Sequence, residues 1–223
     1  MEERLPLLRT TVLFRGMADA EILHALECLH ARELRFDRDQ IIWEPDKQLY
    51  WAVVVHGSLL VQQEDLRGNH SILGDFGPGS FLNNGSSYAL PGAQPFFFSV
   101  CAGTVLLLLE RGAAMKPCNS GCRAHLLLLR NAVCAMEQNQ ARLLQKIEYL
   151  GKRSTREKLL AYLAIQSALQ GSRKINVPYT RQELADFLAV DRSAMCTELT
   201  RMQHDGLLRY ERKRFELLEE EEN

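Results

Sequence analysis

The sequence predicts an α+β protein in three parts: an N-terminal antiparallel β-roll (a double-stranded β-helix of the cupin type), a long dimerisation helix and a C-terminal winged helix-turn-helix. Three observations predict this order. Short apolar runs between turn residues fill residues 40–110, and a heptad seam runs through residues 126–150. Two capped helices joined by a tight turn lie in residues 180–204. The composition, with 46% hydrophobic and 25% charged residues, is that of a globular protein.

The β-roll is predicted from residue composition and from the spacing of turn residues. Residues 17–31 first place Ile22, Leu26 and Leu29 at the spacing of an amphipathic helix. Segments rich in β-branched and aromatic residues follow, separated by turns that contain Gly or Pro, at residues 40–43, 49–63, 70–76 and 96–110. Such runs are typical of a β-sandwich or barrel, and a block of about 70 residues can form a small core of its own.

The long helix is predicted from an uninterrupted seam. From Cys122 to Leu150 the chain has neither Gly nor Pro, and its seam residues recur at steps of three and four. They are Leu126, Leu129, Val133, Met136, Gln140, Leu143, Ile147 and Leu150. This pattern favours a two-stranded coiled coil, and therefore a homodimer, with Gln140 setting the register. The alternative is that the helix packs on its own β-roll through Leu127, Leu128 and Leu144.

The C-terminal part is marked by helix caps. Gly151 ends the long helix, and residues 151–153 form the expected hinge. Ser154 with Glu157 makes a capping box, which begins a helix that ends at Gly171.

A second capping box, Thr180 with Glu183, begins the first helix of a helix-turn-helix. Asp191 caps a further helix that extends to His204. Gly206 follows, at a helix end where a residue with positive φ is expected. Residues 207–218 then read as two short strands with a basic tip, which is a wing.

The charge of the C-terminal part indicates a polyanionic partner. Residues 152–214 hold 13 Lys and Arg against 7 Asp and Glu, although the whole chain has a net charge of −1. The residues expected to contact DNA are Thr180, Arg181, Asp191, Arg192, Ser193, Thr197, Arg201, Arg212 and Lys213. The Arg192 guanidinium suits O6 and N7 of guanine, which is worth about 1–3 kcal/mol of discrimination. The alternative is that it contacts phosphate only.

Residues 179–208 resemble the helix-turn-helix of the Crp–Fnr regulators, and Val55–Val61 with Gly77–Phe81 resemble their β-roll. The resemblance covers about residues 10–218. It implies a transcription regulator that binds a palindromic double-stranded DNA operator as a twofold dimer, with RNA polymerase as a possible partner. In the family an early Arg commonly contacts guanine, and here that position is Arg192. Ser193 and Thr197 replace the family's Glu and second Arg, so its usual half-site does not carry over.

The sensor departs from the cyclic-nucleotide-binding members of that family. Asn84 stands in the place of their Glu, and the chain has no Arg or Lys between Gly68 and Glu110. Because a cyclic phosphate needs a charge partner, neither cyclic AMP nor cyclic GMP is expected to bind. The predicted effector pocket consists of Asn84, Ser86, Tyr88, Phe96 and Phe98. Either it takes an apolar effector, or its aromatic side chains only fill the roll.

No cofactor, metal or catalytic residue is predicted. The six cysteines show no paired CxxC spacing and are expected to be free thiols. Cys118 and Cys122 are either ordinary thiols or part of a redox or metal site, and no cysteine precedes Cys28 to suggest an Fnr-type iron–sulfur cluster. A cupin-like enzyme would need clustered ligands, whereas the roll has only His56 and His70. A ligand-sensing subunit without DNA binding is the other alternative.

The expected domains are residues 1–120 (roll with its N-terminal helix), 121–151 (dimerisation helix), 152–218 (winged helix-turn-helix) and 219–223 (acidic tail). The acidic N-terminus does not read as a signal peptide, and no apolar run approaches the length of a membrane span. The sequence therefore predicts a cytoplasmic protein with no membrane contact.

Overall fold

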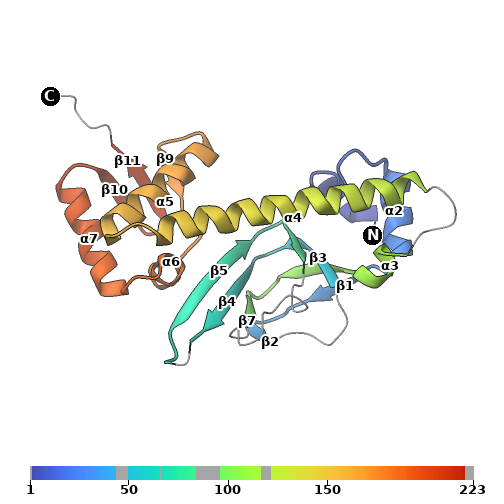
Figure 1. The fold of residues 1–223 in the computed structure, drawn as a ribbon, viewed down its shortest axis with the longest axis horizontal. Coiled ribbons are helices and arrows are strands. Elements are labelled where there is room, and N and C mark those ends of the chain that lie inside the picture. The colour runs from blue at the N-terminus through green and yellow to red at the C-terminus, as the bar shows by residue number, and fades with distance from the viewer. Residues whose placement is uncertain (1, 44–49, 66, 84–95, 117–121, 219–223) are drawn as a thin grey trace. The chain divides into compact units, whose positions relative to one another are not determined.

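A computed structural model of the chain describes residues 2–43, 50–65, 67–83, 96–116 and 122–218 (Figure 1). The chain forms two compact units, residues 1–141 and residues 142–223. The long helix α4 (Arg123–Leu150) begins in the first unit and ends in the second. The expected order of β-roll, long helix and helix-turn-helix is confirmed.

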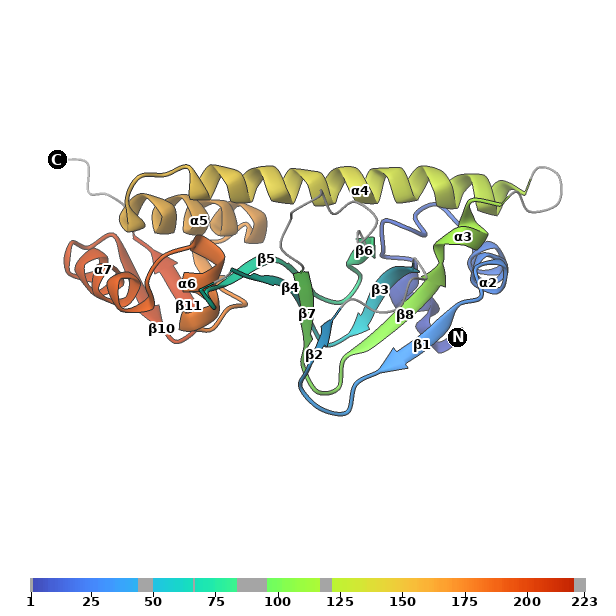
Figure 2. The same cartoon turned by 60° about the horizontal axis from the view of Figure 1, so that its bottom comes forward.

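Two four-stranded antiparallel sheets make up the roll of the first unit. One has the strand order β1-β8-β3-β6 and the other the order β2-β7-β4-β5. Strands β1, β8 and β3 lie side by side in Figure 2. The strands are Arg32–Arg35 (β1), Gln40–Trp43 (β2), Tyr50–His56 (β3), Leu59–Glu64 (β4), His70–Phe76 (β5), Phe81–Asn83 (β6), Phe96–Val100 (β7) and Val105–Glu110 (β8).

Strands β1 and β6 were not predicted. β1 reads Arg-Glu-Leu-Arg and has no buried residue, so its sequence lacks the apolar alternation that marks a half-buried strand. It forms because it pairs with β8, where Leu34 lies opposite Leu106. β6 has only three residues and pairs with β3. Both strands follow from pairing with a neighbour rather than from a local pattern.

Strand β3 is buried on both faces, which explains its nearly continuous apolar sequence. Ala52 and Val54 join the cluster between the two sheets, together with Leu59, Phe98, Val100 and Leu106. Trp51, Val53 and Val55 belong instead to a second cluster, which also contains residues of α2 (Asp19–Cys28) and α4. The sheet of β3 therefore separates the interior of the roll from a layer of helices.

The predicted N-terminal helix is confirmed as α2, in which Ile22 and Leu26 are buried. Three short helical segments of the first unit were not predicted. They are η1 (Glu2–Arg4), α1 (Leu5–Leu8) and α3 (Arg111–Ala114), each at most four residues long. Helices of one turn carry no periodic signal of their own.

In the first unit, α4 packs on the roll through small residues and one amide. The buried apolar positions of this face are Ala124, Leu128, Ala132 and Ala135. Asn131 is 3% exposed, and its Nδ2 donates to the backbone oxygens of Leu13 (3.1 Å) and Arg15 (2.8 Å). Leu127 packs partly against this core, as the alternative expected. Leu144 does not, because its side chain is 59% exposed.

The second unit is a winged helix-turn-helix. Its elements after α4 are α5 (Thr155–Gln170), β9 (Lys174–Asn176), α6 (Arg181–Leu188), α7 (Arg192–His204), β10 (Leu208–Glu211) and β11 (Arg214–Leu217). Strand β9 was not predicted. It pairs antiparallel with β11 to give the sheet order β10-β11-β9, with Ile175 opposite Phe215. No helix in the described ranges of either unit has the length and apolar character that a membrane span needs.

Candidate nucleic-acid interface

Side-chain caps set the position of α6 at both ends. At its N-terminus Thr180 Oγ1 accepts from the backbone N–H of Glu183 (3.2 Å), and a Glu183 carboxylate oxygen accepts from that of Thr180 (2.6 Å). At its C-terminus Lys158 Nζ donates to the carbonyl oxygen of Leu188 (3.1 Å). A cation at the C-terminal carbonyls stabilises a helix. Ala189 then takes φ 49° and turns the chain toward α7.

Helix α7 is divided into a buried face and an exposed face. Asp191 caps it, since its Oδ1 accepts from the backbone N–H of Ala194 (2.8 Å). Met195, Leu199 and Met202 are fully buried beneath it. The exposed side carries the predicted contact residues of this helix, which are Arg192, Ser193, Thr197 and Arg201. The first turn of α7 therefore presents an Arg and a Ser to solvent.

The threonines of α7 have directional hydroxyls. Thr197 Oγ1 donates to the backbone oxygen of Ser193 (3.0 Å), and Thr200 Oγ1 donates to that of Cys196 (3.1 Å). A hydroxyl that has used its single hydrogen offers only lone pairs to other groups. Thr197 is therefore ready to accept a hydrogen bond rather than to donate one.

Glu198 of α7 forms ion pairs with two arginines. Arg156 of α5 donates from Nε to Glu198 (2.5 Å) and from Nη2 to Asp205 (2.7 Å). Arg201 Nη1 lies 3.6 Å from the second oxygen of Glu198. The hydrogen bond from Arg156 holds the pKa of Asp205 below its usual value. The sequence offered no sign of this role for Arg156, because the contact joins residues 42 positions apart.

Arg181 lies against the wing rather than in open solvent. Its guanidinium carbon is 4.9 Å from the centroid of the Tyr210 ring and 4.8 Å from that of the Phe215 ring. Burial there lowers the pKa of Arg181. Such cation–π contacts stabilise by about 0.5–2 kcal/mol. The residue joins α6 to the β10–β11 hairpin.

The wing carries the remaining predicted residues at its tip. Arg212 and Lys213 form the two-residue connection of the β10–β11 hairpin, and Arg212 takes φ 50°. Lys213 Nζ donates to the backbone oxygen of Pro178 (2.5 Å). Arg212 is exposed. Arg212 is therefore the exposed cation at the tip, whereas Lys213 bonds the tip to the segment before α6.

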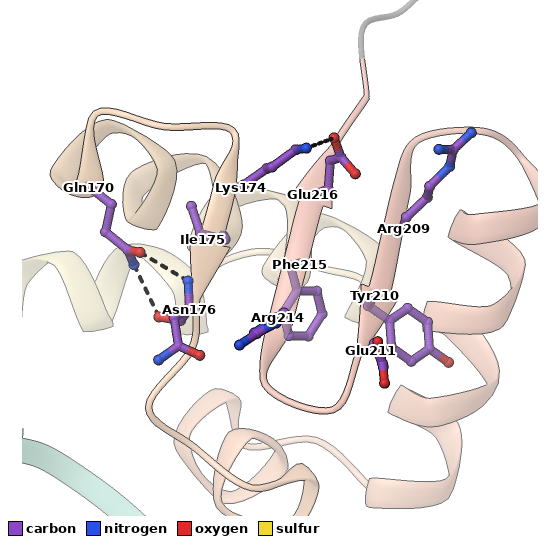
Figure 3. A pocket seen from close by; sticks show the side chains of 10 residues that line it. All are labelled: Gln170, Lys174, Ile175, Asn176, Arg209, Tyr210, Glu211, Arg214, Phe215 and Glu216. Carbon is purple, nitrogen blue, oxygen red and sulfur yellow. Dashed lines mark hydrogen bonds and ion pairs between the residues drawn. The ribbon is translucent and has the colours of Figure 1, made fainter.

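The outer face of the wing sheet forms a charged hollow of about 500 Å³ (Figure 3). Lys174 Nζ lies 3.4 Å from a carboxylate oxygen of Glu216 on the neighbouring strand. The side chain of Gln170 bonds both backbone groups of Asn176, at 2.9 and 3.1 Å. Basic and acidic residues alternate across this face, so it lacks the single sign of charge seen at the tip.

The roll is expected to hold the predicted effector pocket. Asn84, Ser86 and Tyr88 lie outside the described residues. Phe96 and Phe98 form an edge-to-face pair with ring centroids 5.8 Å apart. Phe98 is 5% exposed within the cluster between the two sheets, and Phe96 packs against that cluster. These two aromatic side chains line the interior of the roll.

The predicted seam on α4 is exposed over much of its length. Four seam side chains are more than half exposed: Leu126 (72%), Val133 (56%), Leu143 (51%) and Ile147 (63%). Leu150 is 37% exposed. Leu129 and Met136 are partly covered by the core of the first unit.

Comparisons with known proteins agree with this arrangement. Residues 157–222 match the family model of the Crp-like helix-turn-helix domain. The transcriptional activator protein FnrL of Cereibacter sphaeroides is 26% identical over 207 residues, which cover 88% of this chain and 79% of that protein. The probable transcriptional regulator flp of Lacticaseibacillus casei is 23% identical over 216 residues, covering 94% and 93%.

Among solved structures, the c-di-GMP-responsive global regulator CLP of Xanthomonas campestris shares the fold with a TM-score of 0.68 and 17% identity, covering 91% of this chain and 100% of that one. Residues 157–222 match a Crp-like helix-turn-helix domain, which is a DNA-binding module. Over most of its length the chain resembles transcription regulators of the Crp–Fnr type in sequence and in fold.

Proposed function

We propose that this regulator binds a palindromic operator as a homodimer, with α7 in the major groove. The observation that carries the proposal is the division of α7, whose apolar face is fully buried while Arg192, Ser193 and Thr197 are exposed. A recognition helix contacts base edges through its N-terminal residues. The cap at Asp191 begins α7 at Arg192, which puts that guanidinium in the first turn.

We infer a half-site with a guanine read by Arg192. Its two parallel donors match O6 and N7 of guanine. Thr197, whose hydroxyl hydrogen is engaged by Ser193, suits a base that offers an amino group, namely adenine or cytosine. Asp191 and Arg181 then serve as positioning residues, the first for α7 and the second for the wing. Thr180 and Arg201 border the reading residues, and Arg212 and Lys213 supply contacts to phosphate.

The dimer is formed by the seam of α4. Exposed apolar side chains at positions such as Leu126, Val133 and Ile147 are unfavourable in water, and a second copy of the same helix would cover them. A twofold dimer presents two copies of α7 to two half-sites, whose centres lie about one helical turn apart.

The signal is received by the roll in the cytoplasm. Either an effector other than a cyclic nucleotide or a redox event shifts the population toward the DNA-binding state. The apolar roll interior around Phe98 is suited to an apolar effector. RNA polymerase is the candidate partner once the operator is bound.

Selection from a random pool of double-stranded DNA by the full-length protein tests the proposal. Sequencing of the retained fragments should give a palindrome with guanine in each half-site, and Arg192→Ala should lose that guanine. Selections with and without a reducing agent report redox control in the same experiment. A pool without an enriched motif, or with a motif that has no twofold symmetry, contradicts the proposal.

A further inference from the structure

A small pocket between α2 and the start of α4 brings together two cysteines and two histidines. It is lined by His24, Ala25, Cys28, Leu29, Cys122, Ala124, His125 and Leu128. Its four apolar wall residues are each at most 4% exposed, whereas both cysteines are half-buried. In both views α2 lies beside the first turns of α4 (Figures 1 and 2). Two thiols from positions 94 residues apart thus share one site.

Cys28 has a base beside it. His24 precedes it by one turn of α2, and the Nε2 atom of His24 lies 3.5 Å from the Cys28 sulfur. An imidazole at this distance can accept the thiol proton and so generate the thiolate, which is the nucleophilic form of cysteine. His24 is exposed, so a small oxidant can reach the pair from solvent.

Cys122 stands at the beginning of α4, where its carbonyl oxygen accepts from the backbone N–H of Leu126 (3.2 Å). His125 Nε2 lies 2.7 Å from the backbone oxygen of Ala114, so this nitrogen is the donor and the ring is held in place. Arg123 and Glu21 form an ion pair that joins α4 to α2. The helix that carries Cys28 is thereby held to the helix that begins directly after Cys122.

We propose that Cys28 and Cys122 form a redox-active dithiol that hydroperoxides oxidise to a disulfide. The Cys28 thiolate attacks one peroxide oxygen, the O–O bond breaks, and the leaving oxygen takes the proton and departs as water or an alcohol. Cys28 becomes a sulfenic acid, and the peroxide is reduced by two electrons. The Cys122 sulfur then attacks the Cys28 sulfur, the S–O bond breaks, and water leaves with the Cys122 proton. Two thiols and one peroxide give one disulfide, one alcohol or water, and one further water.

The other cysteines are less suited to this chemistry. Cys101 and Cys134 are exposed, and Cys196 belongs to the second unit. Cys118 lies outside the described residues. Within the described ranges no group of three or more His, Cys, Asp or Glu side chains is arranged to hold a metal ion. The pocket therefore favours chemistry between its two thiols over metal binding.

The disulfide would join the end of α2 to a residue one turn before Leu126, the first seam position. This consequence rests on the proposed function, because it takes the seam as the dimer interface. A disulfide at Cys122 would restrict the position of the first turn of α4, and the seam lies on this helix. We expect oxidation to change operator affinity by at least about fivefold, the lower end of allosteric coupling.

The test treats full-length protein with one equivalent of hydrogen peroxide, blocks the remaining thiols and maps peptides by mass spectrometry. Wild type should lose two thiols and yield a Cys28–Cys122 peptide pair, at a rate independent of protein concentration. Cys28→Ser and Cys122→Ser should yield no pair. Cys101→Ser, Cys134→Ser and Cys118→Ser, the matched controls, should behave as wild type. His24→Gln should slow the reaction several-fold and leave its end point unchanged.

Absence of the Cys28–Cys122 pair, or a pair through Cys118, overturns the proposal, and a wild-type rate for His24→Gln overturns the role of the imidazole. Operator affinity of reduced and oxidised protein is measured separately. Failure of both the reduced and the oxidised protein to select DNA counts against the proposed function alone. A disulfide that forms without any change in affinity overturns only the link to the seam.

Discussion

The ammonium nitrogen of Lys146 lies 4.9 Å from the centroid of the Phe187 ring. Lys146 is on the last part of α4 and Phe187 is on α6, both in the second unit. Tyr149 and Tyr162 pack around the same ring, with centroids 6.1 and 5.5 Å from that of Phe187. The end of α4 is thus joined to the helix-turn-helix through a buried cation, and burial lowers the pKa of Lys146 to about 8.

Lys146→Met should stabilise the second unit. Below pH 8 the folded state carries a charge that burial disfavours, and methionine keeps the apolar stem without that charge. We expect a gain of about 1–2 kcal/mol at pH 7, because loss of the cation–π contact offsets part of the relief. Calorimetric unfolding of the full chain measures it, with the half-exposed Lys152→Met as the control. Equal stability of Lys146→Met and wild type contradicts the prediction.

Wild-type stability should rise with pH above about 8. The folded pKa of Lys146 is about 8, and the ordinary value is 10.5. Between these values the unfolded chain binds more protons than the folded chain, so the free energy of unfolding increases with pH. Unfolding between pH 7 and 9.5 should show this slope in wild type and a weaker one in Lys146→Met. Parallel curves would rule out Lys146 as the source.

Arg192→Ala should weaken binding to the selected operator by about 1–3 kcal/mol, since one bidentate contact to guanine is lost. Fluorescence anisotropy with operator and with unrelated DNA measures the two affinities. Affinity for unrelated DNA should change far less. Arg209→Ala removes an equal charge from an exposed site on the outer face of the wing sheet and serves as the control. If both variants lose affinity equally on both DNAs, Arg192 contacts phosphate only.

Arg212→Gly should lower the salt dependence of DNA binding without harming the hairpin. Glycine accepts the positive φ of 50° at this position, so only the charge is removed. One fewer phosphate contact reduces the slope of log affinity against log salt by about 0.9. Binding isotherms at several salt concentrations give the slope, and an unchanged slope would place Arg212 away from phosphate.

Val133→Lys should convert the dimer to a monomer. Val133 is 56% exposed at a seam position, and a lysine facing its own copy in the partner brings like charges together. Lysine is a better helix former than valine, so α4 itself should persist. Sedimentation velocity measures the mass. Leu169→Lys changes a 69% exposed leucine on α5 and should stay dimeric; a dimeric Val133→Lys would contradict the seam.

Gly57→Ala should destabilise the roll by more than about 2 kcal/mol. Gly57 has φ 79°, and a Cβ there would lie 2.7 Å from the Cα of Thr104, a backbone atom that cannot move aside cheaply. Gly77→Ala is the matched control, because no atom lies within 4 Å of its Cβ position. Thermal unfolding compares the two variants, and equal melting temperatures would contradict the close approach at Gly57.

Sequence reasoning worked best where the signal is local. Capping residues Ser154, Thr180 and Asp191 began their helices as expected. It worked poorly for short polar strands such as β1 and β9, which contain one or no buried residue. It also gave no sign that Arg181 lies against the rings of Tyr210 and Phe215, because these residues are far apart in the chain.

The sequence by itself determined the order of the three parts, the ends of the main C-terminal helices and the face of α4 that carries the seam. Periodicity, caps and helix-ending glycines act over a few residues, so they can be recognised directly in the sequence. The tertiary structure alone decided the pairing of β1 and β9, the burial of Lys146 and the meeting of Cys28 with Cys122. Each joins residues far apart in the chain, and contacts of this kind exist only after the chain has closed on itself.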